Sequence, residues 1–148
     1  QPDFLVSSLK KTHELAPSNR IIVEINEKAI TDTDEMARLR NSLEKLNIGL
    51  AFDDFGVGQT RLLELAKAPP DYLKFDASLI HQIHLAPRRL HQMISTFVKA
   101  AHDLGIDTLA EGIECADEAE TCHRLGFNFA QGFFYSRPLP ITEINFNS

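Results

Sequence analysis

Five short runs of apolar residues alternate along the chain with longer segments in which apolar residues recur every three or four positions. The short runs are rich in β-branched, aromatic and aliphatic residues. They mostly lack a polar alternation, which is typical of strands covered on both faces. The sequence therefore predicts five strands: IIVEI (21–25), IGLAF (48–52), YLKF (72–75), IDTLA (106–110) and FNFAQ (127–131).

The intervening segments predict amphipathic helices. In the segment 34–46 the apolar residues fall three and four positions apart, and Asp32 with Glu35 resembles a capping box before them. The predicted helices cover residues 2–16, 34–46, a short stretch after Gly58, 88–105 and 117–125.

Alternating strands and helices predict an α/β fold with a parallel sheet and right-handed crossovers. The sheet could be open and doubly wound, or it could be part of a TIM-like (β/α)₈ barrel. A full barrel takes about 200 residues or more. With 148 residues and about five βα units, the chain supplies just over half of one.

Composition narrows the class of protein. The chain is 43% apolar and 24% charged, which is ordinary for one soluble domain, and a net charge of −6 argues against a nucleic-acid polymer as partner. No apolar run is long enough for a membrane contact or a secretory signal. Gln1 in place of an initiator Met suggests a processed chain or a piece of a longer one.

The spacing of the two cysteines bears on the redox state of the compartment. Cys115 and Cys122 lie seven positions apart. On one helix their Cα atoms would be about 10 Å apart, too far for a disulfide. A reduced, cytoplasmic location therefore fits best.

Acidic residues follow the predicted strands, and parallel α/β proteins bind ligands at the carboxyl ends of their strands. Bunched carboxylates repel one another unless a cation neutralises them, and oxygen-rich clusters suit Mg²⁺ or Mn²⁺. Two such ions would activate a water and stabilise a phosphoryl transition state. The strand-end residues are Glu24, Glu27, Asp53, Asp54, Lys74, Asp76, Glu111, Glu114 and Gln131.

Asp53 and Asp54 can serve one centre only if the backbone turns, because successive strand residues point to opposite faces. Gly56 and Gly58 are expected to provide that turn. A simpler reading is that Asp-Asp before Gly-x-Gly caps the next helix. The Asp-Phe-Gly triplet is not read as a kinase motif, because no glycine-rich nucleotide loop precedes it.

Several other residues have simple structural readings. Lys74 taken by itself could be a solvated lysine, and residues 111–114 could form a plain loop. Three histidines, His81, His84 and His91, could bind a metal. Exposed helix positions are favoured for them, because no HExxH spacing or Cys partner supports such a site. The cysteines are read as packing thiols.

The ordered set of motifs is more specific than any one of them. The segments VEINE (23–27), DDFGVG (53–58), DYLKFD (71–76), AEGIE (110–114) and QGFFYSRPLP (131–140) together resemble the second half of an EAL domain. The resemblance implies one partial EAL domain over residues 1–148, on a modified TIM barrel. It also implies a cyclic di-GMP phosphodiesterase of bacterial second-messenger signalling, which uses Mg²⁺ or Mn²⁺ to form the linear dinucleotide.

The resemblance also implies roles for eight side chains. The predicted metal ligands are Glu24, Asp53 and Asp54. The predicted catalytic residues are Lys74, which positions the attacking water, and Glu111, a general base. The remaining residues are Gln131 and Pro138 on the substrate side, and Glu27, which steadies the loop after the paired aspartates.

Departures from the family leave a second function open. The Glu-Ala-Leu motif and an expected asparagine ligand do not occur, and residues 56–61 read GVGQTR where the family usually has Gly-Thr-Gly-Tyr-Ser-Ser. The alternative is therefore an inactive EAL domain acting as a cyclic di-GMP receptor or protein-interaction module. A third reading is an open five-stranded binding scaffold.

The same departures shape the expected partners. The chain by itself is not expected to turn over cyclic di-GMP, and its first strand should leave an unpaired edge. Expected partners are a second copy or another EAL half, and sensor or GGDEF-type domains in the parent protein.

Overall fold

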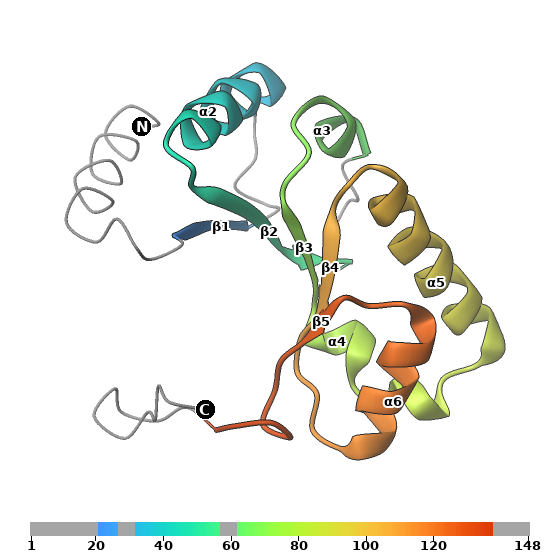
Figure 1. Ribbon diagram of the computed structural model, residues 1–148. Helices are drawn as coiled ribbons and strands as arrows, with labels where there is room; N and C mark the ends of the chain where they lie inside the picture. The colour runs from blue at the N-terminus through green and yellow to red at the C-terminus, as the bar shows by residue number, and fades with distance from the viewer. Residues whose placement is uncertain (1–20, 27–31, 57–61, 138–148) are drawn as a thin grey trace.

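The five strands of the computed structural model form one parallel sheet with the order β1-β2-β3-β4-β5 (Figure 1). The structure describes residues 21–26, 32–56 and 62–137. The expectations for the helix over 2–16, for Glu27, for the 57–61 loop and for Pro138 lie outside these residues. The strands are β1 (Ile22–Asn26), β2 (Gly49–Phe55), β3 (Tyr72–Phe75), β4 (Asp107–Ala110) and β5 (Phe129–Ala130).

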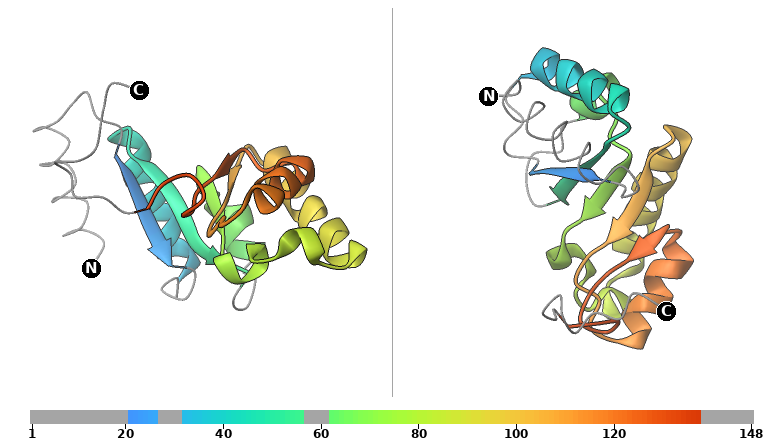
Figure 2. Two further views of the ribbon diagram at one scale, coloured as in Figure 1. Left: turned by 90° about the horizontal axis from the view of Figure 1, so that it is seen from below. Right: turned by 60° about the vertical axis from the view of Figure 1, so that its left-hand side comes forward.

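The strand order decides between the two predicted closures. A doubly wound sheet reverses its strand order at a switch point, whereas a barrel adds each strand beside the one before it. Here every strand pairs with its sequence neighbour across the described segments. Figure 2 shows how this row of strands twists from β1 to β5. The arrangement is that of consecutive strands in a TIM-like barrel.

Helices lie along one side of the row of strands (Figure 1). The four predicted helices in the described part of the chain are all present, with ends within two residues of the expected ones where the sequence set both ends. Two short elements, α4 (Ala77–Ile80) and η2 (Ile83–Leu85), were not predicted, because four and three residues are too short to show a periodic pattern. The helical elements are α2 (Thr33–Lys45), α3 (Leu62–Lys67), α4 (Ala77–Ile80), the 3₁₀ helix η2 (Ile83–Leu85), α5 (Arg88–Asp103) and α6 (Ala116–Leu125).

Helix ends follow from local chemistry. The Asp32 carboxylate accepts the backbone N–H groups of Asp34 and Glu35 and so begins α2 as predicted. Asp76 begins α4 in the same way by accepting the N–H of Ser78.

The apolar stripes of the helices bury the hydrophobic core against the sheet. Leu43, Leu50 and Ile106 are fully buried or nearly so. Phe75 packs edge-to-face on Phe127, with ring centroids 4.9 Å apart. Burying such side chains contributes about 1.5–3 kcal/mol each, so the helix-covered side of the sheet supplies most of the stability.

The prediction that the strands are covered on both faces is wrong for β1. Its burial alternates, with Ile22, Glu24 and Asn26 exposed and the two residues between them half-buried. β1 lies at the edge of the described sheet and only β2 pairs with it. The exposed face therefore carries two polar side chains, Glu24 and Asn26, as well as the apolar Ile22.

None of the helices in the described ranges combines the length and the apolar character that crossing a lipid bilayer requires.

Candidate active site

A break in the regular pairing of β2 brings Asp53 and Asp54 to one place. Phe52 pairs with Leu73, but Phe55 pairs with Phe75, so β2 carries one extra residue in this interval. Asp54 has φ 60°, in the left-handed region that Asp tolerates better than most side chains. The bulge lets two consecutive carboxylates face the same centre.

This geometry corrects the predicted source of the turn. The sequence placed it at Gly56 and Gly58, after the strand. The structure keeps both aspartates inside β2 and makes the turn at Asp54 itself, followed by Gly56 with φ 95°. Gly58 lies outside the described residues. A bulge leaves no signature in composition, so the sequence pointed to the nearby glycines instead.

Lys74 is the centre of the charged cluster. Its side chain is 7% exposed, and its Nζ lies 2.9 Å from Glu24 Oε1, 3.0 Å from Glu111 Oε1 and 3.7 Å from Asp53 Oδ1. The simpler reading of a solvated strand-end lysine is therefore wrong. Burial acts to lower the pKa of Lys74, but its hydrogen bonds to Glu24 and Glu111 outweigh burial and raise that pKa.

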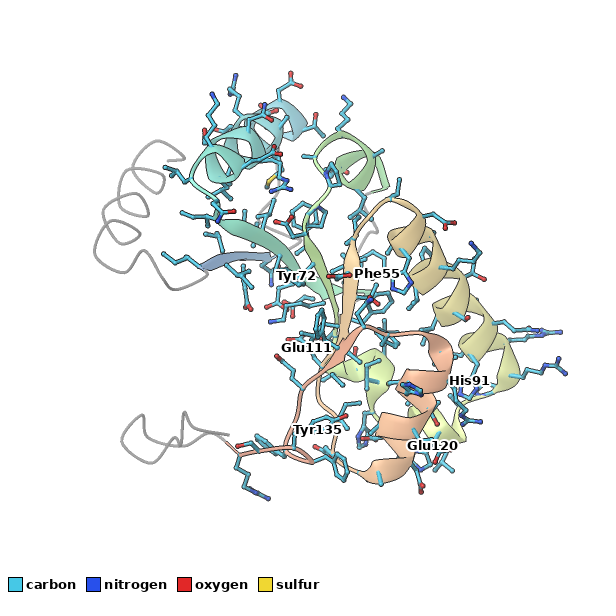
Figure 3. All side chains as sticks on the ribbon, viewed as in Figure 1. Phe55, Tyr72, His91, Glu111, Glu120 and Tyr135 are labelled. Carbon is cyan, nitrogen blue, oxygen red and sulfur yellow. The ribbon has the colours of Figure 1, made fainter. Side chains whose placement is uncertain are left out.

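Glu111 sits just after β4, where the neighbouring strands also end (Figure 3). Burial raises the pKa of Glu111, and the nearby charge of Asp53 acts in the same direction while Lys74 opposes both. Gln131 donates a hydrogen bond of 3.1 Å to Glu111 Oε1. A carboxyl group with a raised pKa that is held by two side chains is suited to exchange a proton.

The position of Gln131 depends on Gly132. A Cβ at residue 132 would lie 2.1 Å from the carbonyl oxygen of Ile113, which is backbone and cannot move aside. Ile113 N also donates to the carbonyl oxygen of Gln131 at 3.0 Å. This close approach fixes the end of β5 against the loop that carries Glu111.

We name the group of Glu24, Asp53, Asp54, Lys74, Glu111 and Gln131 the acidic rim. Sequence reasoning predicted all six. It missed Asn26, whose side-chain amide donates to Asp54 Oδ2. The signal was present, because Asn26 is two residues after Glu24 and therefore shares its face of β1.

Two other strand-end carboxylates have contacts of their own. Asp76 caps α4. Glu114 Oε2 lies 3.8 Å from His81 Nδ1.

Ligand atoms of Asp53, Asp54 and Glu111 all lie within 4.8 Å of one another. An all-carboxylate donor set of this kind fits a hard cation such as Mg²⁺ or Mn²⁺. Glu24, the third predicted metal ligand, is not in this set and pairs with Lys74 instead. The residues present therefore fit a divalent cation at the rim.

An open cavity of about 510 Å³ adjoins the rim. Glu111 and Gln131 line it on the rim side, and Phe133 and Arg137 line it farther along the chain. The Arg137 guanidinium carbon lies 5.1 Å from the centroid of the Phe133 ring. The cavity thus offers carboxylates, an exposed aromatic ring and a cation within one space.

Comparison with known proteins gives a consistent result. The family model described as "EAL domain" matches residues 1–138. The "Bifunctional diguanylate cyclase/cyclic di-GMP phosphodiesterase MucR" of Pseudomonas aeruginosa is 31% identical over 144 residues, which is 95% of this chain and 21% of that protein.

Solved structures agree on the fold. "PaMucR Phosphodiesterase, c-di-GMP complex" superposes with a TM-score of 0.82 at 30% identity, covering 93% of this chain and 57% of that one. "Klebsiella pneumoniae BlrP1 pH 9.0 manganese/cy-diGMP complex" gives a TM-score of 0.79 at 33% identity, covering 90% and 34%. The chain thus spans about a fifth of the length of its first curated relative, at 21%, and little more than half of the PaMucR structure.

Proposed function

Because the chain belongs to the EAL domain family, we propose that the protein containing it hydrolyses cyclic di-GMP to the linear dinucleotide. The observation that carries the proposal is the acidic rim around the buried ammonium of Lys74. Its side chains come from β1, β2 and β3 and from the residues directly after β4 and β5. The similar proteins, a cyclic di-GMP phosphodiesterase and two structures in complex with cyclic di-GMP, support the substrate class.

Asp53, Asp54 and Glu24 are proposed to hold Mg²⁺ or Mn²⁺ at the rim, with Glu111 beside them. When bound, the two cations neutralise charge on the phosphoryl group and lower the pKa of a water. Manganese in a similar structure supports the use of a divalent cation.

The protein's own side chains have distinct parts in the reaction. Lys74 donates hydrogen bonds from a fixed ammonium and so orients the attacking water. Glu111 accepts the proton of that water, and its raised pKa brings it closer to neutral pH as a base. Gln131 holds Glu111 in place through its 3.1 Å hydrogen bond.

The cavity beside the rim is the proposed substrate site. Phe133 offers a face for a guanine base, and Arg137 offers positive charge for a phosphate. Pro138 follows directly and is proposed to line the same site. Glu27 is proposed to steady the loop after the aspartates. Both residues lie outside the described part of the chain.

The active form is proposed to need more than these 148 residues. We expect the chain by itself to be inactive and to pair with a second copy or with another EAL half, because β1 presents an unpaired edge in the described sheet. Sensor or GGDEF-type domains in the parent and a cytoplasmic location are further parts of the proposal.

The test uses the full-length parent protein. It is incubated with cyclic di-GMP and Mn²⁺, and the linear product is measured by chromatography. Asp53→Ala should abolish product, whereas Asp103→Ala, which changes an exposed aspartate on α5, should leave the rate unchanged. Equal product from Asp53→Ala would overturn the assignment of the rim.

A second candidate function is a non-catalytic receptor. The observation that favours it is the sequence GVGQTR at 56–61, which departs from the family's usual loop at four positions. A receptor would bind cyclic di-GMP tightly and yield no linear product under the same conditions. The binding and product measurements on one sample therefore separate the two functions.

A further inference from the structure

A second group of metal-ligating side chains lies away from the acidic rim, where η2 meets α6. Ligand atoms of His84, Cys115 and Glu118 all lie within 4.8 Å of one another. Sequence reasoning set the histidines aside because no cysteine partner was visible. For His84 the structure supplies the missing partner, since the fold brings Cys115 beside it from 31 positions along the chain.

His84 carries an unusual polar atom. Its Nδ1 is buried and has no hydrogen-bond partner. Among the buried side-chain nitrogen and oxygen atoms of the described segments, it is the only one without a partner. Buried ring nitrogens are nearly always paired, because leaving one without a partner costs the full desolvation of that group. A bound ligand would satisfy this unpaired nitrogen.

Glu118 places a negative charge in the same spot. Its side chain is 2% exposed, and its carboxylate accepts the backbone N–H of Gln82 at 2.7 Å and of Glu114 at 2.8 Å. Burial acts to raise the pKa of Glu118, but the N–H groups of Glu114, Gln82 and Cys115 outweigh it and lower that pKa. The carboxylate thus stays ionised and fixed in orientation.

We propose that the Cys115 thiolate, the His84 imidazole and the Glu118 carboxylate bind one Zn²⁺ ion between η2 and α6. The fourth position would go to a water or to His81, whose Nδ1 lies 3.8 Å from Glu118 Oε1. As the sulfur–zinc bond forms, the Cys115 thiol releases its proton to solvent. One thiolate and one carboxylate then balance the two positive charges of the ion.

The geometry is close to what zinc requires. Bonds of about 2.0–2.3 Å in a tetrahedron place ligand atoms about 3.3–3.8 Å apart. The three ligand atoms now lie within 4.8 Å of one another, so binding would draw them about 1 Å closer together. The ion would join the loop 111–115 to η2, and that loop begins with Glu111 of the rim.

The two sites differ in donor chemistry, so this proposal does not rest on the proposed function. The rim offers carboxylate oxygens, which suit hard cations. The second cluster offers sulfur and nitrogen, which suit zinc and cobalt. Excess Mg²⁺ can therefore saturate the rim while leaving the second cluster free.

The test titrates the reduced 148-residue chain with Co²⁺ in excess Mg²⁺. One equivalent should produce the near-ultraviolet thiolate-to-cobalt charge-transfer band and visible absorption of a tetrahedral ion, and Zn²⁺ should displace it. Cys115→Ser should abolish the band. His84→Gln should weaken Co²⁺ binding by about tenfold or more.

Two controls keep the result specific. His123→Gln changes an exposed histidine of α6 and should leave the titration unchanged, as should Asp53→Ala at the rim. Circular dichroism of each variant verifies folding, and His84→Gln provides the decisive comparison if Cys115→Ser does not fold. Absence of the band in the unchanged chain, or its persistence in Cys115→Ser, would overturn the proposal.

Discussion

Replacing Lys74 with methionine should destabilise the chain when divalent cations are removed. Methionine keeps most of the length and the apolar stem of lysine but removes the ammonium, which is 2.9 Å from Glu24 and 3.0 Å from Glu111. The carboxylates would then face one another with nothing between them. The expected loss in the free energy of unfolding is about 2–4 kcal/mol at neutral pH, since breaking a buried pair by removing one partner costs about 3–5 kcal/mol.

That range follows from the exposure of the partners. At an effective dielectric constant of about 20, two unit charges about 3 Å apart attract by roughly 5–6 kcal/mol before desolvation is subtracted. Glu111 is largely buried and feels much of this attraction. Glu24 is 53% exposed, so solvent screens its pair and the pair contributes about 1 kcal/mol or less.

The loss should also depend on pH. Without Lys74 the pKa of Glu111 rises further above its ordinary value. A carboxyl group whose pKa is higher in the folded state favours folding at low pH, and that advantage disappears as the pH rises through the raised pKa. The deficit of Lys74→Met should therefore be small at about pH 4.5, the ordinary pKa of a glutamate, and should grow as the pH rises above it.

The assay is urea denaturation in EDTA and again in Mn²⁺. Mn²⁺ at about 100 times its dissociation constant should restore roughly 2.7 kcal/mol. Lys99→Met is the matched control, because Lys99 is 75% exposed and pairs with Asp103 at 3.0 Å, a contact of about 0.5 kcal/mol or less. If Lys74→Met in EDTA were as stable as Lys99→Met, the electrostatic account of the rim would be refuted.

Three further predictions concern single side chains. Asp54→Ala should cost about 1–2 kcal/mol in urea denaturation, because alanine tolerates φ 60° poorly and Asn26 loses its acceptor, whereas Asp54→Asn should keep stability and lose Mn²⁺ affinity in a titration. Glu118→Gln, measured in a chelator, should cost about 2–3 kcal/mol at neutral pH. The pKa of Glu118 is lowered from 4.5 in the folded state, so its carboxylate stabilises the unchanged chain above pH 4.5. That stabilisation disappears as the pH falls below 4.5, and the difference between the variant and the unchanged chain should disappear with it. Burial raises the pKa of Cys122 to about 12, so iodoacetamide at about pH 8 should label Cys115 and spare Cys122 by mass spectrometry, and equal labelling would contradict the burial.

The fold was largely predictable, because the secondary structure of a long periodic segment can be read from its own sequence. The apolar stripes of α2 and α5 face the sheet. The five apolar runs form the strands of that sheet. The elements that sequence reasoning missed, α4 and η2, are too short to show a period. The exposure of β1 was also missed, because it depends on β1 having one neighbour and on nothing within the run itself.

The rim was predictable for a different reason. Its residues lie at or just after the carboxyl ends of strands. In a parallel sheet these ends lie at one edge, independently of the conformation of the loops. The bulge at Asp54 and the meeting of His84 with Cys115 were not predictable, since both depend on register and on packing between distant segments. The position of Asn26 could have been predicted, because the alternation of side chains along β1 puts it on the same face as Glu24.

Strand alternation separates the parts of this chain that give stability from those that bear chemistry. In β3, Leu73 and Phe75 belong to the hydrophobic core, while Lys74 between them points to the rim. Three carboxylates there share one ammonium, and Asp54 adds a fourth negative charge beside two of them. An excess of like charge opposes folding unless a cation is bound. Apolar burial on the helix-covered face offsets that repulsion, so the rim can remain electrostatically unfavourable without unfolding the sheet. A one-residue slip of β3 would exchange the two faces, which is why the apolar pattern of the strand also fixes where its single lysine points.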